Sequence, residues 1–276
     1  MHHTATVEAT LARVAFGSEP DRWPLPSATS PQQLWLRAVA SGAQGRYGSA
    51  YRDLSVLRSS VSAGRLVSLA HSTQGSFLRQ LGWHALARGW DGRALALAGA
   101  DPEARGDALI GLAADALGVG RFAAAAALLT RADQDLTRAS VPDRLAVRRS
   151  WVGAELAMAR GEGQIAVRHA EEAVEQVQAM STNKTINSMG SARHRVKSDV
   201  VLAAALCSAG STERARAVAD AALDDTGRLG LIPLRWALAC LLIDIGSVTF
   251  EPPEMREIRD ICAGQVRRAG GTWRCA

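Results

Sequence analysis

Apolar residues recur at helical spacing along nearly the whole chain, and polar residues fill the positions between them. Within residues 4–16, Val7, Leu11 and Val14 fall on one face, which predicts a short amphipathic helix. The sequence lacks long runs of β-branched residues, strict apolar–polar alternation and Asn-Gly turns, which are the usual signals of strands. We therefore expect an all-α protein.

The stretch 17–31 is rich in proline and serine and cannot continue a helix, and after it the helical segments are expected to come in pairs. The six expected pairs are 31–42 with 47–62, 65–88 with 91–99, 102–118 with 121–138, 143–160 with 163–180, 191–209 with 211–228, and 231–245 with 253–269. A polar gap at 181–190 is the main internal loop expected. The chain thus divides into an N-terminal helix and arm, 1–30, and a helical repeat domain, 31–276.

Six glycines share the same surroundings and support this pairing. Each has alanine or glycine seven positions earlier, and all but the last have alanine five positions later; they are Gly45, Gly89, Gly120, Gly161, Gly210 and Gly246. A turn glycine flanked by small residues allows two antiparallel helices to pack closely. A helix pair that is apolar on more than one side must stack on its neighbours to bury that surface. The pattern therefore predicts a solenoid of about six pairs.

The best-matching repeat runs from Leu109-Ile110-Gly111-Leu112-Ala113 through Gly120-Arg121-Phe122 to Ala125, Leu129 and Ala132. It resembles the tetratricopeptide repeat family. The repeats are degenerate, because the aromatic residue that the family has two positions after the turn glycine is present only as Tyr47 and Phe122. The resemblance implies a right-handed solenoid whose first helices line a concave groove. The helix at 253–269 has a charged surface, as a terminal capping helix requires.

In this family the groove side chains stand about ten, six and three residues before the turn glycine. We apply this register to the present sequence and add a position at the rim of the groove, thirteen residues before the glycine. The resulting candidate binding groove consists of Trp35, Arg79, Trp83, Arg148, Trp151, Glu155, Lys197 and Trp236. Tryptophan and arginine often dominate binding energy. The alternative is that the tryptophans only fill space between alanine-rich helices, and the sequence does not separate the two.

The chain has a net charge of +5 and is rich in arginine and alanine, a composition that GC-rich coding also produces. Its densest positive cluster is a basic patch of Arg193, His194, Arg195 and Lys197, which is either a solvated helix start or a site for an acidic partner or RNA. The four cysteines are far apart, so we expect free thiols and no metal site. No leader or membrane span is recognisable, which predicts a cytoplasmic protein.

No catalytic motif is present, since the six histidines are scattered and no phosphate-binding loop follows a strand. We expect no enzymatic activity and no cofactor. The preferred hypothesis is a scaffold or adaptor that binds a protein or peptide, rather than nucleic acid or a membrane, in the concave groove. Two alternatives are a stand-alone regulator that responds to a ligand or peptide and acts through another protein, and an RNA-associated scaffold.

Overall fold

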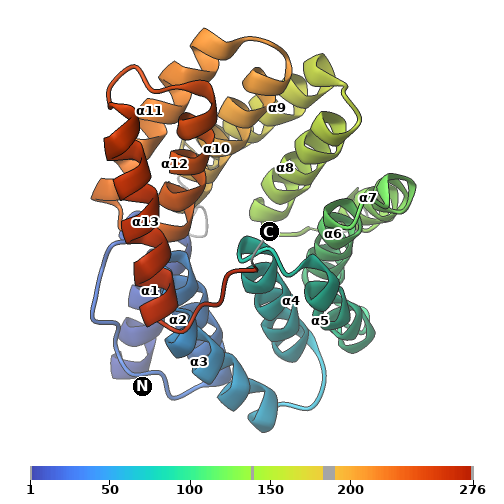
Figure 1. Ribbon diagram of the computed structural model, residues 1–276. Coiled ribbons are helices and arrows are strands. Elements are labelled where there is room, and N and C mark those ends of the chain that lie inside the picture. Colours follow the sequence, from blue (N-terminus) through green and yellow to red (C-terminus); the bar gives the residue numbers. More distant parts are fainter. Residues whose placement is uncertain (1, 138–139, 183–189, 275–276) are drawn as a thin grey trace.

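The computed structural model describes residues 2–137, 140–182 and 190–274 (Figure 1). These residues form thirteen helices and no strand, which confirms the all-α prediction. The first helix, α1 (His2–Phe16), begins two residues before the start expected at residue 4. No helix in the described ranges combines the length and the apolar character needed to cross a membrane. Most of the expected loop at 181–190 lies outside the described residues.

Six helix pairs follow α1. They are α2 (Pro31–Ala43) with α3 (Tyr47–Ser60), α4 (Arg65–Gln80) with α5 (His84–Leu97), α6 (Pro102–Gly118) with α7 (Phe122–Thr137), α8 (Arg144–Ala159) with α9 (Gly163–Thr182), α10 (Ala192–Ser208) with α11 (Thr212–Arg228), and α12 (Ile232–Ile245) with α13 (Pro252–Arg268). Side-chain caps and prolines define several starts, as at Pro31, where Ser30 Oγ accepts the N–H of Gln33 at 3.2 Å.

The turn inside each of the first five pairs has the same hydrogen bond. The N–H that follows the turn glycine donates to the carbonyl five residues earlier, at 2.8–2.9 Å, in Arg46–Ser41, Trp83–Leu78, Arg121–Ala116, Glu162–Ala157 and Ser211–Leu206. This is a Schellman-type C-cap, which needs a positive φ and therefore favours glycine. The alanine five residues after each glycine is fully buried against the partner helix.

The register predicted for the second pair is wrong. Its turn glycine is Gly82, with a φ of 88°, whereas Gly89 lies inside α5. Gly82 also fits the pattern, because Gly75 stands seven residues before it and the buried Ala87 five residues after it. The expected helices 65–88 and 91–99 are therefore replaced by α4 and α5. Trp83 moves from the inner helix to the turn.

The solenoid curves so strongly that its two ends meet (Figure 1). The N–H of Gly48, in the first turn of α3, donates to the carbonyl of Ala269, just after α13, at 2.7 Å. Val266 of α13 belongs to the same apolar cluster as the core of α1–α4. The helix expected to cap an open stack therefore closes a ring, although Arg256 and other charged residues still cover its outer side.

The segments before α2 and after α13 also pack on the ring. The Ala192 N–H at the start of α10 donates to the carbonyl of Gly17 at 3.1 Å, so the end of α1 reaches the fifth pair. At the other end of the chain, Arg274 N–H donates to the carbonyl of Leu81 at 2.9 Å. Apolar clusters follow one another around the ring, so the core lies within its wall.

Candidate functional site

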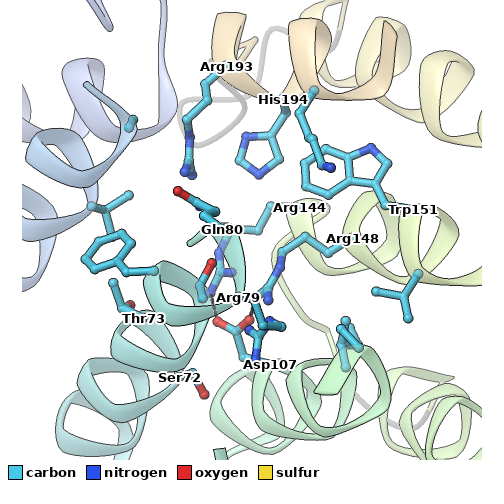
Figure 2. Close-up of a pocket in the computed structure, with 18 of the residues that line it drawn as sticks. Ser72, Thr73, Arg79, Gln80, Asp107, Arg144, Arg148, Trp151, Arg193 and His194 are labelled. Carbon is cyan, nitrogen blue, oxygen red and sulfur yellow. Dashed lines mark ion pairs between the residues drawn. The ribbon is translucent and has the colours of Figure 1, made fainter. Parts of the chain in front are cut away.

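A cavity of about 320 Å³ lies inside the ring, where the inner helices α2, α4, α6, α8, α10 and α12 face one another (Figure 2). These are the first helices of all six pairs, so the repeat pattern itself places their side chains on the inner surface. Phe16 at the end of α1 and His84 at the start of α5 complete the lining. The volume is near the lower end of the range of about 300–1,000 Å³ for ligand sites.

Aromatic side chains form one part of the wall. Trp35 is only 4% exposed, and its indole N–H donates to Thr73 Oγ1 at 3.1 Å. The Phe16 ring lies 5.4 Å from the Trp35 ring. Trp151, on α8, donates its indole N–H to Ser198 Oγ at 2.9 Å. Because both indole N–H groups are satisfied within the protein, these tryptophans offer the cavity an apolar surface.

Two arginines on α8, one turn apart, supply positive charge. Arg144 Nη2 lies 2.6 Å from Glu103 Oε1 and 3.0 Å from Asp107 Oδ2, and Arg148 also pairs with Asp107. Burial lowers the pKa of Arg144, against the opposing effect of Glu103. Burial, reinforced by the charge of Arg79, lowers the pKa of Arg148 to about 10. Both guanidinium groups are therefore charged at neutral pH in a poorly solvated place.

A buried acid pair surrounds Arg79 on the α4–α6 side of the cavity. Arg79 Nη1 pairs with Asp91 Oδ2 and lies 2.9 Å from Asp115 Oδ1. Both carboxylates have fully buried side chains, and burial raises both of their pKa values, although Arg79 acts to lower them. A Cβ atom at Gly75 or at Gly111 would stand 2.5 Å from a carboxylate oxygen of Asp91. The two glycines therefore make room for this carboxylate between α4 and α6.

The first turns of α10 bring a third group of side chains to the cavity. Figure 2 shows Arg193 extending inward from α10, with His194 between it and Trp151. The His194 ring stacks on Trp151 at 5.4 Å, and its Nδ1 lies 2.7 Å from Ser191 Oγ. Burial, together with the charges of Arg193, Arg144 and Arg148, lowers the pKa of His194 well below its ordinary value, so the ring is neutral at neutral pH.

The structure brings most of the predicted site residues together. Eight of the predicted residues line the cavity, namely Trp35, Arg79, Arg148, Trp151, Glu155, Lys197, Arg193 and His194. The remaining three lie elsewhere. Trp83 donates its indole N–H to the carbonyl of Thr272 at 2.7 Å, Trp236 stacks on Trp273 at 4.1 Å, and Arg195 pairs with Asp225 at 2.5 Å. The expected basic patch is thus divided, with Arg195 exposed and the other three members turned to the cavity.

Sequence reasoning missed several residues that shape the site. Arg144 stands four residues before Arg148, so the helical spacing could have placed both on one face. Phe16 and His84 carried no such signal, since one belongs to α1, outside the predicted groove, and the other was assigned to the wrong helix. Gly118 allows the His84 ring to pack against the end of α6, because a Cβ atom there would overlap the ring.

The lining of the cavity is rich in cationic and aromatic side chains. No group of three or more metal-ligating side chains occurs in the described part of the chain. Five cationic side chains line the cavity together with aromatic side chains and the carboxylates of Asp107 and Glu155. A comparison with models of known protein families finds no match, and a comparison with curated proteins finds none either. The cavity is therefore the feature of this protein that bears on its function.

Proposed function

We propose that the protein is a non-catalytic binding module, a tetratricopeptide-like solenoid that holds a short acidic segment of a peptide or protein in its interior cavity. The observation that carries the proposal is that the inner helices of all six pairs line one cavity that combines cationic and aromatic side chains. Arginine recognises carboxylates through paired hydrogen bonds, and tryptophan supplies apolar contact area. This combination suits a ligand with both acidic and apolar parts.

The size of the cavity favours an extended segment over an amphipathic helix. A helix with its side chains is about 10–12 Å across, so it needs a long open groove. The ring instead encloses a space of about 320 Å³, which suits a few side chains or the end of a peptide. The partner that we propose is therefore a short, extended and acidic segment.

A ligand-responsive regulator, acting through another protein in the cytoplasm, is the second candidate, and the closed ring favours it. An occupant of the cavity would contact α4, α6, α8 and α10 at the same time. A ligand that binds the folded ring and not the unfolded chain stabilises the ring by mass action. Another protein that binds the outer surface of the folded ring would in this way respond to a ligand inside it.

The test selects peptides from a library of short sequences against the wild-type protein. The same selection is run in parallel against two variants. In Ala114→Phe the new side chain fills the cavity, and Ala124→Phe, on the exposed side of α7, is the matched control. We expect enriched peptides that carry Asp or Glu next to an apolar residue, that bind the Ala124 variant normally and that lose binding to the Ala114 variant. Peptides that bind both folded variants equally well would place the binding site outside the cavity and contradict the proposal.

A further inference from the structure

Among the charged side chains that line the cavity, Arg193 has an unusual position. Arg79, Arg144, Arg148 and Lys197 each have at least one carboxylate partner, the last through Lys197 Nζ to Glu155 Oε1 at 3.4 Å. Arg193 has no ion-pair partner among the residues that the structure describes. Its Nε–H is buried and donates to no hydrogen-bond partner there.

The surroundings of Arg193 make this arrangement costly for the empty protein. Its guanidinium carbon lies 5.7 Å from the centre of the Phe16 ring, and that of Arg144 lies 5.5 Å from the same centre, so two cations share one ring. Burial, together with the charge of Arg144, lowers the pKa of Arg193 to about 10. A cation in the first turn of a helix is also disfavoured by the helix dipole. Three separate effects therefore oppose a charge at this position.

The side chains around Arg193 suit a ligand that has one negative charge beside an apolar group. Phe16 and Trp151 offer ring surfaces on either side of the Arg193–His194 pair. The Ser191 hydroxyl can donate to His194 Nδ1, which leaves the proton of the neutral ring on Nε2 as a second donor. A planar guanidinium binds a carboxylate through two parallel hydrogen bonds.

We propose that Arg193 is the anchor for a single carboxylate of the ligand, with His194 as a second donor and with Phe16 and Trp151 against the apolar part next to that carboxylate. This inference deepens the proposed function and rests on it. One cation without a partner is balanced by one carboxylate, whereas a phosphate dianion would leave an excess negative charge. The occupant is therefore an acidic ligand that presents one carboxylate at the α8–α10 side of the cavity.

The test compares thermal melting of the wild-type protein with that of Arg193→Met, which keeps the length of the side chain and removes its charge. The matched control is Arg195→Met, two residues further on, where the arginine is exposed and paired with Asp225. The probes are 3-phenylpropionate, the neutral 3-phenylpropionamide, and phenyl phosphate, each at the same ionic strength. Without a probe, we expect Arg193→Met to melt about 2–4 °C above the wild type, because the uncompensated charge is gone.

With the probes, we expect 3-phenylpropionate to raise the melting temperature of the wild type and of Arg195→Met, and to leave Arg193→Met unchanged. The amide should have no effect on any of the three proteins. The inference is overturned if the amide stabilises the wild type as much as the carboxylate does, if phenyl phosphate stabilises it more than the carboxylate, or if no probe stabilises it. It is also overturned if Arg193→Met melts below the wild type and is still stabilised by 3-phenylpropionate. Selected peptides that need the cavity but bind Arg193→Met normally would overturn this inference and leave the proposed function standing.

Discussion

At the scale of single residues, the chain keeps more charge inside the ring than a purely structural core would require. Asp91 and Asp115 share Arg79 in a place where neither carboxylate is exposed to solvent. Removing one partner from such a cluster leaves an uncompensated buried charge, whereas well-packed apolar residues would hold the same helices together at less cost. Buried charges of this kind concentrate at functional sites, and Arg79, which the two carboxylates share, lines the cavity.

The acid pair leads to a prediction on pH. Because burial raises the pKa of Asp91 in the folded protein, the folded state binds more protons than the unfolded chain above about pH 4, the ordinary pKa of a carboxyl group. The stability contributed by this group is then greatest below that pH and decreases as the pH rises through the raised pKa. Asp91→Asn removes the titration.

The measurement is the free energy of unfolding in urea, for the wild type and Asp91→Asn, at several pH values between about 5 and 8. The stability of the wild type relative to the variant should decrease across this range, by about 1.4 kcal/mol for each pH unit over which only the folded state holds the proton. A difference that stays constant, or that grows with pH, would show that Asp91 is ionised throughout.

At the scale of the helices, the sequence predicted most of the fold. Because the hydrogen bonds of a helix and its turn are local, apolar spacing, prolines and turn glycines define the ends of five of the six pairs to within a few residues. The error in the second pair arises because the sequence allows two registers there. Gly82 and Gly89 both have small residues at the expected distances, and only the tertiary packing of α4 on α6 chooses between them.

Two alanine substitutions test the corrected register. Gly82 has a φ of 88°, so Gly82→Ala should destabilise the protein by about 1 kcal/mol or more. Gly89 lies within α5, and a Cβ atom there would meet no atom within 4 Å, so Gly89→Ala should stabilise it by roughly 0.5–1 kcal/mol. Urea unfolding of both variants gives the comparison. The opposite ranking of the two variants would show that the turn lies at Gly89 and that the corrected register is wrong.

At the scale of the whole molecule, the sequence predicted which helices face inward and could not predict that the ring closes. Closure depends on small rotations between successive pairs, and these accumulate from packing details spread over the chain. For the same reason, Trp236 was expected in the groove, whereas the closed ring brings Trp273 of the returning C-terminal segment onto it. Trp35 and Trp151 reach the cavity from correctly placed inner helices, and Arg79 reaches it from α4 although the register of the second pair was wrong.

Closure of the ring is what turns a concave surface into a cavity, so it is the central claim to measure. The most direct test is the distance between spin labels at the exposed positions Arg52 on α3 and Arg268 on α13, attached through unnatural amino acids so that the native cysteines stay unmodified. A pulsed electron resonance experiment should give a single short distance, because Arg52 is one turn from Gly48 and Arg268 precedes Ala269. An open solenoid, with five steps of 8–10 Å between successive pairs, would instead give about 40–50 Å and would contradict the account.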